Sequence, residues 1–212
     1  MKARSSKVNR AWLNDHLNDP YVKRAQAEGL RSRAAYKLEE LIDRDRLLKP
    51  GMRVVDLGAA PGGWSQMARA RLGDRGRVLA LDILPMDAIA GVEFLQGDFR
   101  DEAVLARLEQ ALGGTGLDLV LSDMAPNMTG VASVDQARAM ELAELARDFA
   151  QAHLDPGGAF LVKLFQGAGF DDYLKDLRRR YAKITMRKPK ASRARSPEVY
   201  ALATGFKPGP AA

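Results

Sequence analysis

The sequence contains no cysteine, and only 7% of its 212 residues are aromatic. The absence of cysteine excludes disulfides, thiolate-bound zinc, iron–sulfur clusters and any mechanism with a cysteine nucleophile. The two histidines, His16 and His153, lie far apart and form no ligand pattern, so we expect structural roles for both and no built-in metal site. The chain also lacks the run of about 18 apolar residues that a membrane-spanning helix needs.

Charge is abundant, and it is distributed unevenly along the chain. The net charge is +6, but residues 1–50 carry +5, residues 51–174 carry −8 and residues 175–212 carry +9. Basic ends that flank an acidic middle predict contact with a polyanion such as nucleic acid. Because periodic apolar residues interrupt the basic C-terminal stretch, we expect it to be folded rather than a solvated tail.

From residue 51 onward, short apolar runs alternate with segments of helical periodicity. The apolar runs are continuous rather than alternating, which is typical of strands buried on both faces of a parallel sheet. We therefore predict an α/β domain with a doubly wound, mostly parallel sheet. The predicted strands cover residues 53–57, 77–82, 92–96, 117–123, 159–165, 184–188 and 199–204, and the predicted helices cover residues 63–72, 101–112, 133–154 and 171–181.

A further helix is predicted before the first strand. Apolar residues recur at helical spacing over residues 32–48, Ser32 is a suitable N-cap, and Gly51 marks the end of the helix. Residues 1–31 show little periodicity and are interpreted as a basic arm. The expected organisation is an arm at residues 1–31, a single domain at residues 32–207 and a tail at residues 208–212.

The first strand leads into a glycine-rich loop, Asp56-Leu-Gly-Ala-Ala-Pro-Gly-Gly-Trp64. Its glycines permit a tight backbone turn and let a ligand approach the N-terminus of the following helix. The spacing matches neither the dinucleotide fingerprint G-x-G-x-x-G nor a phosphate-binding P-loop. An aspartate two residues before the first glycine favours a ligand that carries an ammonium group, such as S-adenosylmethionine.

Carboxylates stand at the ends of the next three predicted strands. Asp82 ends the second strand, where an acid can accept hydrogen bonds from the two hydroxyls of an adenosine ribose. Asp98 follows the third strand and could hold the adenine amino group, and Asp123 ends the fourth. One such acid alone is typical of a solvated strand end, but three at consecutive ends downstream of a glycine loop indicate a ligand-binding edge.

Lys163 lies within the apolar run AFLVKLF of the fifth predicted strand. A lysine there must lose the hydration of its ammonium unless it is paired or reaches a cleft. One interpretation is a side chain that extends past the strand end to reach water. The other is a lysine that accepts a proton during catalysis, with Asp123 on the neighbouring strand end as its partner.

Six segments of the chain occur in a characteristic order: SRAAYKLEE, VVDLGAAPGGWSQ, LQGDFRDE, SDMAPNMTG, PGGAFLVKLFQG and RKPKASRARSPEVY. Together they resemble the bacterial FtsJ/RrmJ-type heat-shock ribosomal RNA methyltransferases, the methyltransferase E family, over nearly the whole chain. The resemblance implies a Rossmann-like fold that uses S-adenosylmethionine. It also implies methyl transfer to the ribose 2′-hydroxyl of a uridine in large-subunit (23S-type) ribosomal RNA, with the assembled large subunit as the substrate.

The same resemblance assigns site residues. By themselves, Lys37 on a charged helix and Glu198 before a late strand would be interpreted as solvated surface charges. The family's Lys-Asp-Lys-Glu catalytic tetrad falls on Lys37, Asp123, Lys163 and Glu198. Its cofactor-binding residues fall on Gly62, Trp64, Asp82, Asp98 and Asp123.

The resemblance also suggests a catalytic or positioning role for each of these residues. Lys163 is the candidate base for the 2′-hydroxyl, Asp123 positions it, and the other two tetrad members orient the ribose. Arg193 and Arg195 are candidates for holding RNA phosphates. We expect a cytoplasmic monomer with ribosomal RNA as its partner and no membrane association.

Three alternatives remain at this point. A base N-methyltransferase usually carries an Asn/Asp-Pro-Pro-aromatic loop after the fourth strand, where this chain has Asp-Met-Ala-Pro-Asn. A catalytically idle ribosome-assembly factor with a methyltransferase fold would not need an intact tetrad. A nicotinamide-dependent oxidoreductase is disfavoured by the glycine spacing.

Overall fold

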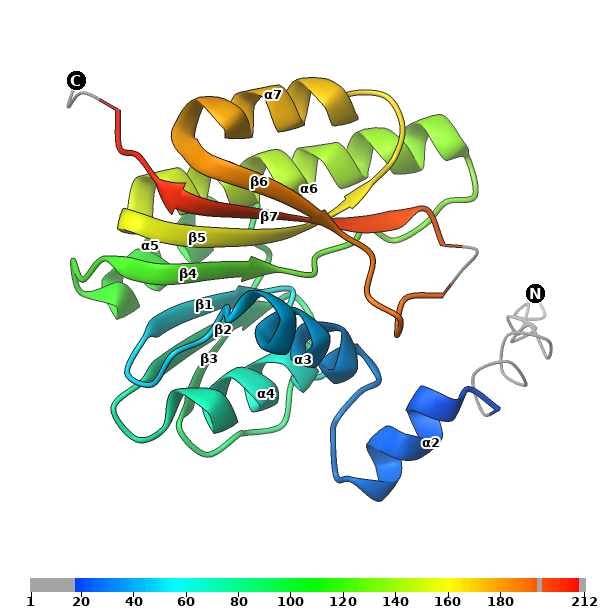
Figure 1. The fold of residues 1–212 in the computed structure, drawn as a ribbon, viewed down its shortest axis with the longest axis vertical. Helices are drawn as coiled ribbons and strands as arrows, with labels where there is room; N and C mark the ends of the chain where they lie inside the picture. The colour runs from blue at the N-terminus through cyan, green and yellow to red at the C-terminus, as the bar shows by residue number, and fades with distance from the viewer. Residues whose placement is uncertain (1–17, 194–195, 210–212) are drawn as a thin grey trace, which may run out of the picture.

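The computed structural model describes residues 18–193 and 196–209, and a seven-stranded sheet forms its centre (Figure 1). The strands are β1 (Arg53–Leu57), β2 (Arg77–Asp82), β3 (Val92–Gln96), β4 (Leu117–Ser122), β5 (Leu154–Phe165), β6 (Tyr181–Arg187) and β7 (Glu198–Phe206). They lie in the order β3-β2-β1-β4-β5-β7-β6. The first five of these are parallel, and β7 runs antiparallel to both β5 and β6.

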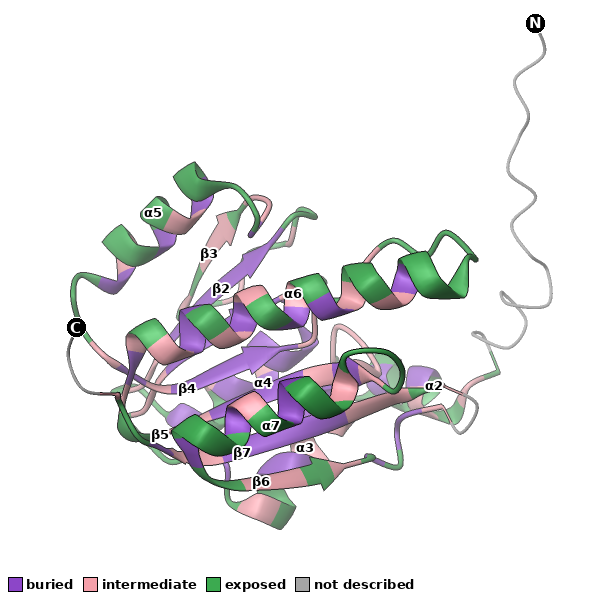
Figure 2. Cartoon of the chain, turned by 90° about the horizontal axis from the view of Figure 1, so that it is seen from above, coloured by how far each residue is buried: buried purple, intermediate pink, exposed green. Residues whose placement is uncertain are grey.

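Helices cover both faces of this sheet (Figure 2). They are α2 (Pro20–Ala27), α3 (Ala34–Asp45), α4 (Gly63–Leu72), α5 (Glu102–Leu112), α6 (Ala132–His153) and α7 (Phe170–Arg180). Because side chains alternate along a strand, Val54 of β1 packs with α3 and α4, whereas Val55 packs with α5 and α6 on the opposite face. None of the helices in the described residues is long and apolar enough to cross a membrane.

The predicted class, a doubly wound and mostly parallel sheet, is confirmed. The predicted bounds agree to the residue for β1, β2, β3 and α4. Strand β5 differs, because it begins at Leu154 instead of residue 159. Leu154 pairs with Leu117 and Ala159 pairs with Leu119, so residues 155–158 leave the ladder opposite the single residue Asp118. Gly157 in this excursion has a φ of 85°, so proline and glycine still form a local turn between two paired parts of the strand.

Helix α2 lies in the segment that the sequence analysis interpreted as an arm of little periodicity. It begins with a proline, and the carboxylate of Asp19 accepts a hydrogen bond from the Tyr21 backbone N–H at 3.0 Å as its N-cap. Ala25 of this helix packs against Tyr36 of α3 and Ala191. The segment from Asp19 onward is thus docked on the domain, while residues 1–17 lie outside the described residues.

The prediction of Ser32 as an N-cap is wrong. Helix α3 begins at Ala34 with Arg33 in the N-cap position, and no side chain caps it. The Ser32 hydroxyl is buried and has no hydrogen-bond partner among the described residues. It lies so close to Gly63 at the start of α4 that a Cβ there would be 2.4 Å from the Ser32 Oγ. Close packing of the two helices, rather than local capping, decides where this side chain points.

Candidate active site

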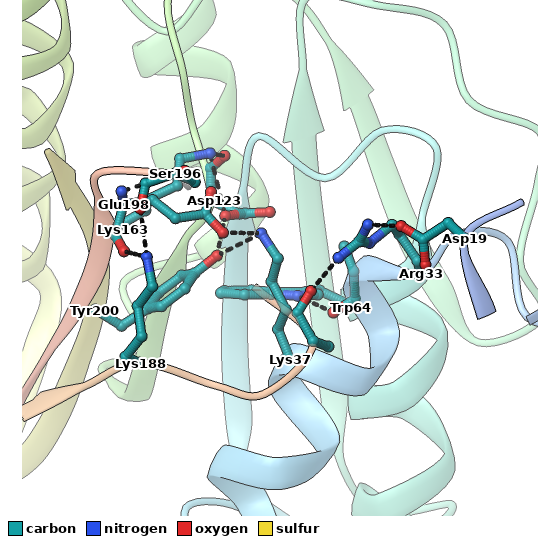
Figure 3. Close-up of polar contacts among 12 residues, drawn as sticks. Asp19, Arg33, Lys37, Trp64, Asp123, Lys163, Lys188, Ser196, Glu198 and Tyr200 are labelled. Atoms are coloured by element: carbon teal, nitrogen blue, oxygen red, sulfur yellow. Dashed lines mark hydrogen bonds and ion pairs between the residues drawn. The ribbon is translucent and has the colours of Figure 1, made fainter. Parts of the chain in front are cut away.

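The candidate site forms where β7 begins beside the end of β5 (Figure 3). The antiparallel register pairs Lys163 with Tyr200 and places Glu198 opposite the last residue of β5. Directly opposed residues point to the same face of a sheet, here the face that α3 and α4 cover. Helix α3, which covers this face, contributes Lys37. Asp123 follows β4 at the end of the neighbouring strand. Topology therefore gathers all four predicted tetrad residues in one place.

Lys163 is held directly by Asp123. Its Nζ lies 3.1 Å from Asp123 Oδ1 and also donates to the Asp123 backbone carbonyl at 2.5 Å. The Lys163 side chain is 8% exposed, so its ammonium has lost most of its hydration. A paired carboxylate and a carbonyl acceptor offset that cost. The juxtaposition expected from the two strand ends is present.

Lys37 and Glu198 form a second ion pair in the same cluster. The Lys37 Nζ donates to Glu198 Oε1 at 2.7 Å, although the two residues are 161 positions apart. Burial raises the pKa of Glu198, but the charge of Lys37 and its hydrogen bond lower that pKa more, so the net shift is downward. Glu198 is therefore a carboxylate at neutral pH and an acceptor for the lysine.

The Tyr200 hydroxyl joins the two ion pairs, although no sequence pattern had marked this residue as functional. It accepts a hydrogen bond from Lys37 Nζ at 3.2 Å and donates one to Asp123 Oδ1 at 2.8 Å. Burial, with the nearby charge of Asp123, raises the pKa of Tyr200 well above its usual value, so the phenol stays a neutral donor. The signal was its position two residues after Glu198 on a strand, which puts both side chains on one face.

A cavity of about 410 Å³ opens beside this network. Its cationic lining includes Arg33 and Arg193 together with Lys37 of the tetrad. The Arg33 guanidinium is fixed by hydrogen bonds to the Asp19 carboxylate and the Ala191 carbonyl. Burial and the charge of Arg193 lower the pKa of Arg33. Such a lining suits an anionic group such as a phosphate. Arg195, the other predicted phosphate ligand, lies outside the described residues.

The glycine loop after β1 makes the tight turn that its sequence predicts. Gly58 and Gly62 have φ values of 78° and 105°, in the region that favours glycine. A Cβ on Gly58 would lie 2.8 Å from the Met124 backbone nitrogen, and one on Gly62 would lie 2.8 Å from the Met86 Sδ. The Met124 backbone therefore requires a glycine at position 58, whereas at position 62 the Met86 side chain can move and the positive φ is the main constraint.

Asp82 is 9% exposed at the end of β2 and anchors this loop. Its Oδ2 accepts from the Ala60 backbone N–H at 2.8 Å, and its Oδ1 accepts from the Leu84 backbone N–H at 2.8 Å. A carboxylate has about four acceptor positions, so about two remain for a ligand. The residue can thus shape the loop and still receive two ribose hydroxyls.

Trp64 and Asp98, the other two predicted cofactor residues, differ in how far their side chains are buried. The Trp64 side chain is 3% exposed, packs between α3 and α4, and donates its indole N–H to the Ala34 carbonyl at 2.8 Å. Only its backbone N–H, in the first turn of α4, is suited to a ligand. Asp98 is more exposed, and its hydrogen bonds with Arg100 lower its pKa, so it is charged at neutral pH.

Asp56 lies beneath the loop and is fully buried. Burial raises its pKa to about 7, and the charges of Asp123 and Asp82 act in the same direction. Its Oδ2 accepts from the Ser65 hydroxyl at 2.6 Å, whereas its Oδ1 has no partner among the described residues. A cationic ligand above the loop would find three carboxylates in its surroundings.

Comparisons with known proteins identify the family. Residues 30–206 match the model of the FtsJ-like methyltransferase family. The chain belongs to this family. It is 70% identical over 200 residues to the ribosomal RNA large subunit methyltransferase E of Xanthomonas oryzae pv. oryzae (strain PXO99A), covering 94% of this chain and 95% of that one.

Further relatives agree with this assignment to the FtsJ-like methyltransferases. The methyltransferase E of Stenotrophomonas maltophilia (strain K279a) is 69% identical over 203 residues, which are 96% of this chain and 97% of that one. A crystal structure described as a ribosomal RNA methyltransferase from Plasmodium falciparum superposes with a TM-score of 0.75 at 28% identity. It covers 83% of this chain and 98% of that one.

FtsJ-like methyltransferases use S-adenosylmethionine as the methyl donor, and the residues of this site fit that molecule. The positive-φ glycines Gly58 and Gly62 form a tight loop that lets a ligand approach the backbone closely. The unpartnered oxygen of Asp56 and the carboxylate of Asp123 suit its positive charge. The remaining acceptor positions of Asp82 suit its ribose hydroxyls.

Proposed function

We propose that this protein transfers a methyl group from S-adenosylmethionine to the ribose 2′-hydroxyl of a uridine in large-subunit (23S-type) ribosomal RNA, with the assembled large subunit as its substrate. The observation that carries the proposal is the continuous hydrogen-bonded network of two lysines, an aspartate, a glutamate and a tyrosine beside the glycine loop. The relatives named ribosomal RNA large subunit methyltransferase E support the substrate class.

The protein's first task is to align the reacting groups. S-Adenosylmethionine, when bound, supplies a methyl group on a sulfonium. Holding the hydroxyl oxygen about 3–3.5 Å from the methyl carbon provides much of the rate through proximity. In the proposal, Lys37 and Glu198 orient the ribose, and the cationic lining of the cavity, Arg33 and Arg193, holds the adjoining phosphates. Arg195 has the same proposed role.

The second task is to remove the proton of the 2′-hydroxyl. We assign this to Lys163 Nζ, which accepts the proton when its amine is neutral. Asp123 fixes that nitrogen through two oxygen atoms and stabilises the ammonium that results. Tyr200 in turn fixes the Asp123 carboxylate through its hydroxyl. The remaining proposed cofactor contacts are Gly62, Trp64 through its backbone N–H, Asp82, Asp98 and Asp123.

The wider organisation belongs to the same proposal. Residues 32–207 form the methyltransferase domain, preceded by a basic arm and followed by a short tail. Helix α2 packs against α3 and Ala191, so the end of the arm is part of the substrate side. A ribosomal RNA substrate places the enzyme in the cytoplasm, and we propose that it acts as a monomer.

The decisive experiment maps 2′-O-methyl groups on total RNA from cells with and without the gene. We expect one large-subunit uridine to lose its ribose methyl group and to regain it with the parent gene but not with a Lys163→Ala gene. Large subunits purified from the deletion strain should then accept labelled methyl groups from S-adenosylmethionine in vitro. An unchanged ribose methylation map, or label on a base, would overturn the proposal in favour of an assembly factor or a base methyltransferase.

A further inference from the structure

The structure separates the basic C-terminal stretch into two groups of charges at opposite ends of the sheet. The charge distribution along the sequence predicted that this stretch contacts a polyanion as a whole. Arg193 lines the active-site cavity. A second group lies at the other end, where α7 ends and β6 begins (Figure 1). We call it the far-end patch, and it consists of Lys175, Arg178, Arg179, Arg180, Lys183 and Lys207, all exposed.

The backbone holds the members of the far-end patch together. Tyr181 at the start of β6 pairs with Phe206 at the end of β7, and Lys183 stands opposite Thr204. The Lys207 backbone N–H donates to the Arg180 carbonyl at 2.7 Å, which brings the segment after β7 next to the end of α7. The patch is therefore a defined surface built from a helix end and two strand ends.

Few of these charges are neutralised within the protein. Among the described residues, Arg179 is the only member of the patch in an ion pair, at 2.9 Å from Asp176, and Asp176 also pairs with Arg147. No acidic residue occurs in the sequence between Asp176 and Glu198. Cations in the last turn of a helix stabilise it by about 0.3–1 kcal/mol each, which accounts for the arginines of α7. It does not account for Lys183 and Lys207, which lie outside the helix.

The patch is too far from the tetrad to serve the methylated nucleotide itself. Eight residue steps separate Glu198 from Phe206 along β7, which is about 26 Å at roughly 3.3 Å per step. Edge strand β6 and the residues after it connect the two regions, with exposed Lys183 and Lys188 along the way and Lys190 beyond them. A polyanion that follows this edge would meet positive charge from the active-site cavity to the far end.

We propose that the far-end patch binds the phosphate backbone of ribosomal RNA that continues beyond the target nucleotide, so that the enzyme contacts its substrate at two places. This inference rests on the proposed function. A short RNA hairpin reaches only the cavity, whereas an extended ribosomal RNA reaches both surfaces. The patch thereby favours a large, folded substrate without any contact to the reacting atoms. Backbone contacts of this kind position the substrate and carry no sequence information.

The test compares a patch variant with a charge-matched control on short and long RNA. The patch variant is R178A/K183A/K207A, and the control is K49A/R75A/R107A, three exposed cations outside the patch that form no ion pair among the described residues. Each is titrated, across a salt series, with a short hairpin that carries the target uridine, with full-length large-subunit RNA and with isolated large subunits. Arg193→Ala serves as a variant expected to weaken binding to all three.

For the patch variant we expect about ten-fold weaker binding to the long RNA and to the large subunit. Its log–log salt slope should be flatter by about two units, since each lost phosphate contact contributes about 0.7–0.9. Binding to the hairpin should equal that of the parent, and so should kcat on saturating large subunits, because the patch does not contact the reacting atoms. The control variant should match the parent throughout.

Three results would overturn the inference. Equal losses on the hairpin and the long RNA would mean that the patch acts at the active site. Equal losses in both triple variants would mean that only net charge matters. A loss on the large subunit but not on long naked RNA would assign the patch to a ribosomal protein. Failure of the proposed function is separate, because it would show as a parent enzyme that methylates no large-subunit ribose.

Discussion

The two halves of the site are built in different ways. The glycine loop comes from one continuous segment, residues 56–64, and its shape follows from positive-φ glycines and close backbone contacts. The tetrad comes from α3, β5, β7 and the end of β4, and opposite charges hold it together. In the proposed function, the locally formed loop binds the cofactor, and the long-range network of charges carries out methyl transfer. Substitutions in the first should therefore change affinity or stability, whereas substitutions in the second should change turnover.

The largest effect is expected for Lys163→Ala. Removal of the proposed base should reduce methyl transfer by about 10²–10⁴-fold, the range typical of general base catalysis. S-Adenosylmethionine binding, measured by calorimetry, should change little, because the glycine loop is untouched. Substantial residual turnover would show that Lys163 is not the base and would weaken the division between the two halves.

Asp56→Asn should change stability instead. Burial raises the native pKa of Asp56 to about 7, above its unfolded value of about 3.9. The native state therefore binds the proton more tightly, and the free energy of unfolding of the parent falls as pH rises from about 4 to about 7. Asparagine cannot ionise, so the variant should lack this decline and be more stable than the parent at pH 8, by about 2–4 kcal/mol.

Urea titrations of parent and variant at pH 5 and pH 8 measure the Asp56 effect. A Ser65→Ala variant, which removes a hydrogen bond that lowers the Asp56 pKa, should keep the decline with pH and extend it to higher pH. Identical pH dependence in the parent and the asparagine variant would contradict a raised pKa for Asp56.

Asp82→Ala should weaken S-adenosylmethionine binding by about 1.5–3 kcal/mol, the range for hydrogen bonds to a charged group. Turnover at saturating cofactor should stay near that of the parent, because the tetrad is intact. Calorimetric titration measures the affinity, and Asp74→Ala, an exposed acid on the connection between α4 and β2, is the matched control. A change within the error of the titration would mean that Asp82 only anchors the loop.

The smallest effect is expected for Tyr200→Phe. The variant keeps the buried ring and both ion pairs but loses the hydroxyl that joins them. We expect kcat to fall about five-fold, which corresponds to about 1 kcal/mol for one hydrogen bond. Cofactor affinity should not change. A kcat equal to that of the parent would reduce Tyr200 to a packing residue.

Patterns of a few residues predicted the cofactor side well. Continuous apolar runs predicted β1, β2 and β3 to the residue, and the glycines between Asp56 and Trp64 predicted the turn. The same local reasoning failed for Ser32, where helix packing outweighs capping, and it placed the start of β5 too late, because Leu154 already pairs with Leu117. It also did not identify Tyr200, whose hydrogen bonds depend on the pairing of β7 with β5.

The sequence by itself determined the fold class, the cofactor loop and the unusual position of Lys163 in an apolar strand. These features follow from the pattern of apolar and polar residues close together in the chain. Only the tertiary structure decided that β7 inserts antiparallel beside β5, which brings Glu198 and Tyr200 to the lysine. It also decided that the basic C-terminal stretch divides between the two ends of the sheet. The physical reason is that ion pairs and charge surfaces depend on distances in space, and residues 161 positions apart can be 2.7 Å apart once the strands are paired.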